Sequence, residues 1–330
     1  MRFISNNNIT DPSLNLALEE YILRSLPDDD DYLLFYINES SIIIGKNQNT
    51  VEEINAEYVE QNGIHIVRRL SGGGAVYHDL GNLNFSFIMK DDGQSFHNFK
   101  KFTEPVVRAL RKLGVDAEMT GRNDLQVGER KISGNAQFST KGKMFSHGTL
   151  LFDSEMDNIV SALKANAEKY VSKSTKSIRS RVANISEFLT EPLTIEQFKQ
   201  SILSSIFEGE EQIPFYELTE QDWDNVRKLA DERYRNWDWN YGRSPAFNVR
   251  QNKRINAAGT FDVRLQVEEG SIVNAAIYGD FFGRGDSTEF AAKLVGTRYE
   301  ANAISQLLDS VDLTYYFGPV TKEDWISLLL

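Results

Sequence analysis

Three consecutive glycines at positions 72–74 are the strongest constraint that this sequence places on its backbone. They lie within RRLSGGGAVYHDLGN, residues 68–82, between an apolar stretch and an aromatic residue. Because glycine has no Cβ, such a run interrupts regular structure and lets a backbone approach a ligand closely. Four successive N–H groups, from Gly72 to Ala75, predict a concave nest for a phosphate, with positive charge from Arg68 or Arg69. An ordinary flexible turn is the alternative interpretation.

Composition excludes several classes of protein. The chain of 330 residues contains no cysteine, which removes disulfides, thiolate metal sites, iron–sulfur clusters and thiolate nucleophiles. A net charge of −12 argues against nucleic acid and anionic membranes as partners. The four histidines lack the i, i+4 pairing of helical zinc sites, and the glycine run has neither Walker A nor Rossmann spacing. There is no signal-peptide core and no apolar run near ~18 residues, so we expect a cytoplasmic protein.

The spacing of apolar residues predicts more strands than helices up to about residue 153. A capping sequence at residues 10–12, with proline in the first turn and helical spacing of apolar residues after it, predicts a first helix. A polar stretch at 164–183, rich in serine and lysine, is typical of a mobile surface loop. The other expected elements are strands at 32–37, 41–45 and 83–89, helices at 95–113 and 195–206, and hairpins at 124–138 and 138–153.

The length of the chain allows one large domain or two modest ones. An aromatic stretch interrupted by Gly242 and Pro245 indicates a crossover between two bodies, and we place the boundary near Gly242. Beyond it, a hairpin at 260–278 and helices at 287–294 and 300–308 predict a small α+β domain. The expected domains are therefore residues 1–242 and 243–330.

A second chemical motif is GRNDLQVGERKISGNAQ, residues 121–137. It places Asp124 and Lys131 on the two arms of one predicted hairpin, so that a carboxylate and an ammonium face one cleft. Asp124 could hold Mg²⁺ while Lys131 neutralises charge that develops on an α-phosphate. A plain cross-strand ion pair on the surface is the alternative.

Two further stretches carry candidate functional groups. SHGTLLFD places His147 at the start of an apolar strand, where a histidine is more often structural than catalytic. KSTKSIRSRVANI contains four basic residues, which indicate either a solvated charge run or a lid that contacts an anion. These residues are Lys173, Lys176, Arg179 and Arg181.

Taken together, these motifs resemble those of the bacterial lipoate-protein ligase A family, whose catalytic fold is shared with biotin protein ligases. The family's arginine pair followed by S-G-G-G-A-V, an aromatic residue and H-D corresponds to residues 68–79, and its N-D-L to 123–125. Its K-x-S-G, H-G-T-L and S-x-R-S-R-V correspond to 131–134, 147–150 and 177–182. Five motifs in one order make coincidence implausible.

The resemblance implies an α+β fold with a mixed β-sheet flanked by helices, in which residues 1–242 form the catalytic domain and 243–330 an accessory domain. It also implies a two-step reaction with ATP, Mg²⁺ and lipoate. Lipoate and ATP give lipoyl-AMP and pyrophosphate, and an acceptor lysine then displaces AMP. The implied partners are lipoyl domains of 2-oxoacid dehydrogenase complexes or a glycine-cleavage carrier protein.

The resemblance assigns the central role to Lys131, which would contact the α-phosphate and the lipoyl carbonyl oxygen, with Asp124 as a possible Mg²⁺ ligand. An apolar slot for the dithiolane tail could come from residues 42–44 and 85–87. The other expected binding residues are Arg69, Ser71, Gly72, Gly73, Gly74, Ala75, Val76, Tyr77, His78, Asn123, Ser133, Gly134, His147, Gly148 and Thr149.

Two alternatives stand beside this interpretation. A biotin protein ligase would carry a G-R-G-R type loop where this chain has Ser71 followed by three glycines. A non-catalytic protein that binds a lipoyl group or a nucleotide would have less need of Lys131 and Asp124. Related enzymes that transfer the acyl group through a thioester use a cysteine, which this chain lacks. The ATP-dependent ligase is therefore the favoured hypothesis.

Overall fold

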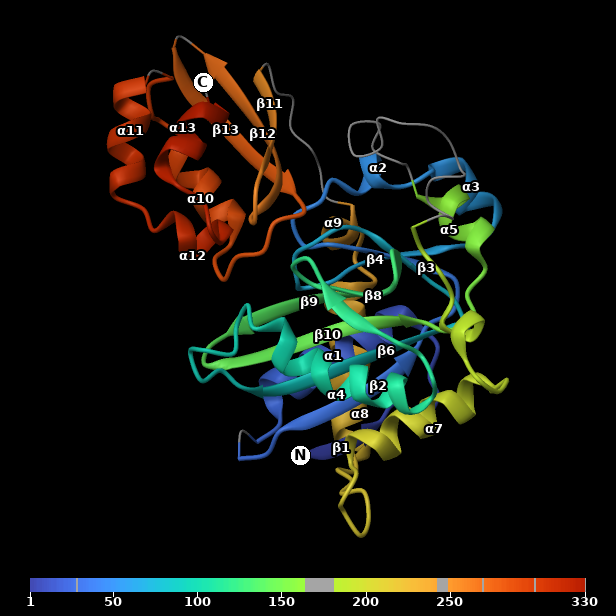
Figure 1. The fold of residues 1–330 in the computed structure, drawn as a ribbon. Helices are drawn as coiled ribbons and strands as arrows, with labels where there is room; N and C mark the ends of the chain where they lie inside the picture. Colours follow the sequence, from blue (N-terminus) through green and yellow to red (C-terminus); the bar gives the residue numbers. More distant parts are fainter. Residues whose placement is uncertain (28, 164–180, 242–248, 269, 300, 330) are drawn as a thin grey trace. The chain divides into compact units, whose positions relative to one another are not determined.

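The computed structural model describes residues 1–27, 29–163, 181–241, 249–268, 270–299 and 301–329 (Figure 1). The chain divides into two compact units. The first contains Met1–Ile43, Val51–Arg68 and Val76–Asn240, and the second contains Ile44–Thr50, Arg69–Ala75 and Tyr241–Leu330. None of the helices in the described residues combines the length and the apolar character needed to cross a membrane.

A mixed sheet forms the centre of the first unit, in the order β1-β2-β6-β10-β9-β8-β7 among the described residues. Strands β1 and β2 pair in parallel and the remaining neighbours are antiparallel. Strands β4, β3 and β5 form a smaller sheet. The bounds are β1 Arg2–Ser5, β2 Tyr32–Ile37, β3 Ser41–Ile44, β4 His65–Arg68, β5 Val76–His78, β6 Asn82–Lys90, β7 Glu118–Thr120, β8 Asp124–Val127, β9 Arg130–Thr140 and β10 Lys143–Leu151.

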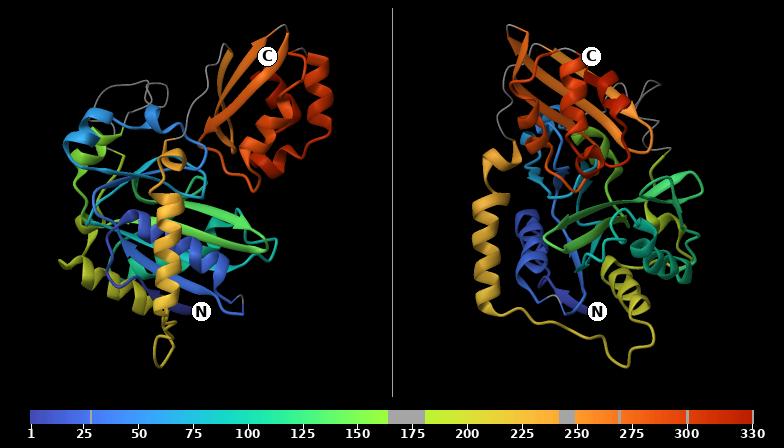
Figure 2. Two further views of the ribbon diagram at one scale, coloured as in Figure 1. Left: turned by 180° about the vertical axis from the view of Figure 1, so that it is seen from behind. Right: turned by 90° about the vertical axis from the view of Figure 1, so that its left-hand side faces the viewer.

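Helices cover both faces of the large sheet. In the right-hand view of Figure 2, α1 and α8 lie on one side of the sheet, and α4 and α7 lie on the other. Aromatic residues of β6 pack with α4 and α7 in one hydrophobic core. The helices of this unit are α1 Pro12–Ser25, α2 Thr50–Glu53, α3 Ala56–Gln61, α4 Phe99–Lys112, α5 Met156–Ala162, α7 Ile195–Ile206, α8 Glu220–Leu229 and α9 Trp237–Asn240, with a 3₁₀ turn at Ile185–Phe188 and a π turn at Ala230–Tyr234.

The second unit has its own sheet and its own core. Strand order is β11-β12-β13, and the helices that follow cover one face. The core is rich in aromatic residues, and the rings of Phe261 and Phe281 stack with centroids 4.7 Å apart. The bounds are β11 Val249–Ile255, β12 Gly259–Glu268, β13 Ser271–Gly279, α10 Ser287–Leu294, α11 Ala301–Asp309, α12 Leu313–Phe317 and α13 Lys322–Leu329.

These elements confirm the predicted α+β class, the first helix, both hairpins of the first unit and the hairpin of the second. One prediction was wrong in its start: the helix expected at 95–113 begins at Phe99. Its N-cap is Asn98, which accepts a hydrogen bond from the Lys101 N–H, and the preceding His97 has a φ of 70° that a helix does not permit. The elements that were not predicted include strands β1, β7 and β11 and helices α2, α3, α5, α8, α9, α12 and α13.

Candidate active site

Lys131 and Asp124 form an ion pair, with Nζ 2.8 Å from Oδ1. They lie on the neighbouring strands β9 and β8, whose register shifts by a bulge between Leu125 and Gln126. The two side chains remain 39% and 30% exposed, so both can reach a ligand. A Cβ on Gly134 would lie 3.2 Å from Lys131 Nζ, so the lysine side chain passes close over that glycine. The predicted pairing of carboxylate and ammonium across the hairpin is present.

The backbone of Lys131 is held on its other side by residues 181–183. Its N–H donates to the Arg181 carbonyl at 2.7 Å, and its carbonyl accepts from the Ala183 N–H at 3.0 Å. The S-x-R-S-R-V motif therefore ends directly on the strand that carries Lys131. Of the basic run, Lys173, Lys176 and Arg179 lie outside the described residues, as does most of the predicted loop at 164–183.

The N-D-L and K-x-S-G motifs are joined by hydrogen bonds. Asn123 donates through Nδ2 to the Asn135 carbonyl at 2.5 Å, and the Asn135 N–H donates to the Asn123 carbonyl at 3.0 Å. The Ser133 hydroxyl is buried and accepts from Asn135 Nδ2 at 3.2 Å. Asn123 and Ser133, predicted to bind substrate, therefore also hold the strands that present Asp124 and Lys131.

The H-G-T-L motif lies on β10, beside β9. His147 is buried, and its Nδ1 donates to the Glu19 carboxylate at 2.9 and 3.1 Å. Thr149 Oγ1 accepts from the Gly134 N–H at 3.1 Å, and Gly148 lies opposite Asn135. Glu19 comes from α1 and was not predicted. It is one of several buried polar residues of α1, and only the packed structure reveals that it faces His147.

The glycine run is organised by Arg69 in the second unit. Its guanidinium donates to the carbonyls of Gly72 and Gly74 at 2.7 and 2.8 Å and to Ser71 Oγ at 3.0 Å. Gly73 has a φ of +91°, a region that favours glycine. Arg68, the alternative source of charge, instead binds Trp239 and Asn240 of the first unit. Arg69 is therefore the arginine that belongs to the loop.

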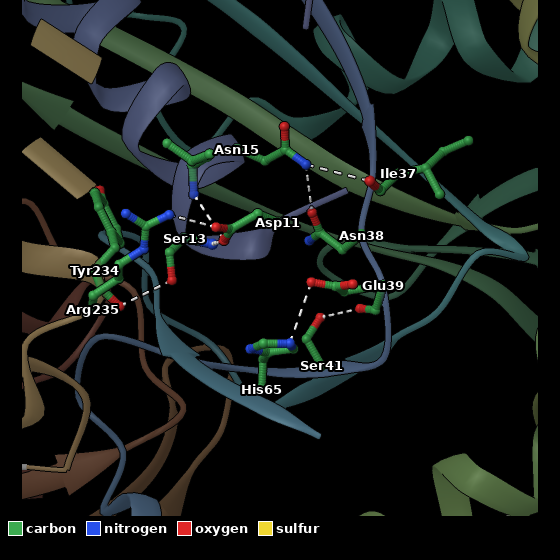
Figure 3. Close-up of polar contacts among 11 residues, drawn as sticks. Asp11, Ser13, Asn15, Ile37, Asn38, Glu39, Ser41, His65, Tyr234 and Arg235 are labelled. Carbon is green, nitrogen blue, oxygen red and sulfur yellow. Dashed lines mark hydrogen bonds and ion pairs between the residues drawn. The ribbon is translucent and has the colours of Figure 1, made fainter. Parts of the chain in front are cut away.

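A buried polar network lies under strand β5. Asn38 Nδ2 donates to His78 Nδ1 at 2.9 Å, and Asn15 Nδ2 donates to Asn38 Oδ1 at 2.8 Å. Figure 3 shows Asn15 joining the start of α1 to Asn38 and to the Ile37 carbonyl. Such a network fixes the imidazole of His78 and so supports the strand that follows the glycine run.

The neighbouring β5 residues are also enclosed. Val76 is half-buried and Tyr77 is buried. Burial raises the pKa of the Tyr77 phenol, and the charge of Asp79 adds to the shift. The tyrosine therefore stays neutral.

The residues expected to form the apolar slot lie in two separate places in the structure. Phe85 and Phe87 belong to the core that packs against α4 and α7. The isoleucines at 42–44 are buried in the smaller sheet and are not part of that core. The two groups of side chains therefore do not form one cluster among the described residues.

No group of three or more His, Asp or Glu side chains that could hold a metal ion occurs among the described residues. Asp124 is thus a single carboxylate beside a cation. Mg²⁺ that arrives with a nucleotide needs only one or two protein carboxylates, because phosphates and waters supply the other ligands. The donor set at Asp124 fits Mg²⁺ of that kind.

Two family models match the chain. The lipoyl protein ligase A/B catalytic domain matches residues 11–207, and the bacterial lipoate protein ligase C-terminus matches residues 244–329. The lipoate-protein ligase LplJ of Bacillus subtilis strain 168 is 60% identical, and the match covers 100% of both chains.

Two solved structures extend these similarities. A bi-partite lipoate protein ligase from Thermoplasma acidophilum, described with its E2 lipoyl domain, is 35% identical with a TM-score of 0.64, over 75% of this chain and 98% of that chain. A lipoate-protein ligase A bound with ATP is 32% identical with a TM-score of 0.61, over 73% of this chain and 98% of that chain.

Proposed function

This chain belongs to the bacterial lipoate-protein ligase family and is a ligase, and from that premise we propose a two-step lipoylation reaction. In the first step a carboxylate oxygen of lipoate attacks the α-phosphorus of ATP, the bond to the β-phosphate oxygen breaks, and pyrophosphate leaves. In the second step an acceptor lysine amine attacks the carbonyl carbon of lipoyl-AMP. AMP leaves, the amine loses a proton, and an amide forms. No enzyme nucleophile is needed, which agrees with the absence of cysteine.

The Lys131–Asp124 pair is the observation that carries this proposal. An ammonium beside the α-phosphate stabilises the charge that grows on it during attack. Mg²⁺ would be held by Asp124 and would neutralise phosphate charge when bound. Because Asp124 and Lys131 interact directly, the carboxylate keeps the ammonium in place until the phosphates offer it another partner.

The loop from Arg69 to Ala75 supplies the proposed adenylate contacts. Ser71, Gly72, Gly73, Gly74 and Ala75 present backbone groups, and Arg69 holds the loop in shape through the carbonyls of Gly72 and Gly74. The proposal also assigns binding roles to Val76, Tyr77 and His78 of β5. Gly148 and Thr149 act through β9, whereas His147 and Glu19 form a buried polar group beside it.

The proposed acceptors are lipoyl domains of 2-oxoacid dehydrogenase complexes or a glycine-cleavage carrier protein, and the proposed location is the cytoplasm. The Thermoplasma relative is described together with an E2 lipoyl domain, which supports the first class of acceptor. We also propose residues 1–242 as the catalytic domain and 243–330 as an accessory domain. The two family models fall on either side of that boundary and support the division.

ATP–pyrophosphate exchange tests the first step. Lipoate, octanoate and biotin are supplied separately to the full chain with ATP and Mg²⁺. Exchange with lipoate and none with biotin is the expected result. Exchange with biotin alone would favour the biotin ligase alternative, and no exchange with any acid, in a protein that binds lipoate, would favour the non-catalytic alternative. Mass spectrometry of each acceptor then reports the second step.

A further inference from the structure

Asn135, directly after the K-x-S-G motif, is bonded to the residue that precedes Asp124. Both the N–H and Nδ2 of Asn135 donate to the Asn123 carbonyl at 3.0 Å. Asn123 Nδ2 donates in return to the Asn135 carbonyl. The two asparagines therefore hold each other through three hydrogen bonds, and Asp124 is the next residue along the chain.

The orientation of the Asn135 amide is fixed by these contacts. Nδ2 has two hydrogens, and its two acceptors are the Asn123 carbonyl and Ser133 Oγ. A flipped amide would lose the hydrogen bond to the Asn123 carbonyl, because Oδ1 and that carbonyl are both acceptors, so the observed orientation is favoured. Oδ1 is buried and has no hydrogen-bond partner among the described residues. Leaving a buried acceptor unpaired costs stability. The two hydrogen bonds that Nδ2 donates must therefore be the contribution of this side chain to the structure.

The H-G-T-L motif makes room for the same side chain. Gly148 lies opposite Asn135 on β10, and a Cβ at Gly148 would lie 2.1 Å from Asn135 Oδ1 and 2.6 Å from the Phe85 ring. No side chain fits there while the amide keeps its place. Three motifs, on β8, β9 and β10, therefore converge on Asn135.

We propose that Asn135 is a positioning residue for adenylate formation. It fixes the direction of the Asp124 side chain at the start of β8, and so the distance between Asp124 and Lys131. This inference rests on the proposed function. Asn135 touches neither Asp124 nor the Lys131 ammonium in the contacts described, so it acts through Asn123. Its loss allows the Asn123 peptide to rotate, because only the backbone N–H of residue 135 then restrains that carbonyl.

The test is ATP–pyrophosphate exchange by the full-length Asn135→Ala variant over a range of Mg²⁺ concentrations. The Mg²⁺ concentration for half-maximal rate is expected to rise about two- to tenfold, as for one lost hydrogen bond, with a smaller change in the rate at saturating Mg²⁺. Asn135→Ser, which lacks the amide but keeps a polar group, should show the same shift and serves if the alanine variant does not fold.

Gln137→Ala is the matched control. Gln137 is buried on the same strand, accepts from the His97 N–H and donates to Ser146 Oγ, and does not contact the N-D-L motif. It should lose stability without a change in the Mg²⁺ dependence. An equal shift in both variants would overturn the proposal, because the effect would then be general loosening of β9.

A double-mutant cycle tests the route through Asp124. In an Asp124→Ala background, Asn135→Ala should change residual exchange less than twofold, because the group that it positions is absent. A full, additive loss would overturn the proposal. Failure of the proposed function is distinguishable, since the parent enzyme itself would then show no lipoate-dependent exchange.

Discussion

Lys131 is held at its side chain and at both backbone polar groups, by Asp124, Arg181 and Ala183. Side chain and backbone are therefore restrained from separate segments of the chain. A lysine normally loses much rotamer freedom when it is fixed, and a partner already in place reduces that cost at the moment of reaction. At the scale of single residues, the site is an ion pair whose lysine is already held in place by its backbone hydrogen bonds.

Lys131→Ala should slow lipoyl-AMP formation by about 10²- to 10³-fold, comparable to the loss of one oxyanion donor. Stability should change little, because the side chain is 39% exposed. Single-turnover pyrophosphate release measures the rate, and thermal unfolding measures the stability. Arg130→Ala is the control, since this neighbouring cation binds Glu187 instead and should leave the rate within about twofold. A Lys131→Ala rate within a factor of ten of the parent would contradict the assigned role.

Gly73→Val should weaken nucleotide binding. Gly73 has a φ of +91°, and a Cβ there would lie 2.8 Å from the Phe282 ring and 3.1 Å from Arg69 Nη2. A branched side chain is strained at that φ and displaces the arginine that shapes the loop. Calorimetry with ATP on the folded variant is the measurement. Gly93→Val is the control, because Gly93 also has positive φ, +77°, but no atoms near its Cβ position. Equal ATP affinity in the parent and in Gly73→Val would mean that the run is only a turn.

At the scale of elements, β9 is the strand on which the site is assembled. It pairs with β10 along one edge and with β8 and residue 182 at its start. Its other neighbour, β8, is short, and the register of this pair shifts at a bulge close to the Lys131–Asp124 ion pair. Toward the other edge of the sheet, β2 lies between β1 and β6, and its residues from Tyr32 to Tyr36 are buried.

Tyr32 of β2 makes the fold sensitive to alkaline pH. Burial, with a contribution from Tyr216, raises the pKa of Tyr32 to about 12 from the ordinary value of 10.0. Because the folded state keeps this proton more tightly than the unfolded chain, the stabilisation is complete below pH 10 and is lost as the pH rises from 10 through 12.

Urea unfolding of the parent and of Tyr32→Phe between pH 9 and 12 measures this contribution. The variant loses the hydrogen bond from the Tyr32 hydroxyl to the Pro27 carbonyl and should be less stable at pH 9. Its free energy of unfolding should nevertheless fall less steeply with pH. Identical slopes in the two proteins would contradict the assignment to Tyr32.

At the scale of the whole molecule, the chain has two separate hydrophobic cores. Two short loops of the N-terminal half nevertheless cluster with the C-terminal part. In the loop at 44–50, Lys46 binds Asp286 at 3.2 Å, and the Asn47 carbonyl accepts from the Gly279 N–H at 2.7 Å. Although burial opposes it, the Lys46 charge lowers the pKa of Asp286. The glycine loop likewise packs against Phe281 and Phe282.

Residues 1–242 should fold alone and still form lipoyl-AMP, because the first core and the Lys131–Asp124 pair lie within them. The KM for ATP should rise, since the glycine loop loses its contacts with Phe281 and Phe282. Pyrophosphate release by the truncated protein measures the first step, and acceptor lipoylation measures the second, which should be lost to a greater extent. A folded truncation that releases no pyrophosphate would show that the C-terminal part helps to build the first active site.

Sequence patterns predicted those features of the fold that depend on neighbouring residues. Asp11 caps α1 as expected, since its side chain accepts from Ser13 and Leu14 N–H groups. The turns of both hairpins in the first unit contain residues with positive φ, such as Gly128 and Gly142. The start of α4 was misplaced at Ser95, because only the structure shows that the Ser95 N–H belongs to a separate turn with Asp92 and that Asn98 is the N-cap.

The sequence by itself determined the α+β class, the five ordered motifs, the cysteine-free chemistry and the pairing of Lys131 with Asp124, because each depends on residue type or on spacing within one hairpin. Only the tertiary structure decided which distant groups support that pair. Glu19 reaches His147 across 128 positions, and Ala183 reaches Lys131 across a segment without periodicity. Such contacts depend on sheet register and helix packing. A single asparagine or glutamate carries no local signal of its partner, so the supports of the site become visible only when the strands are in register.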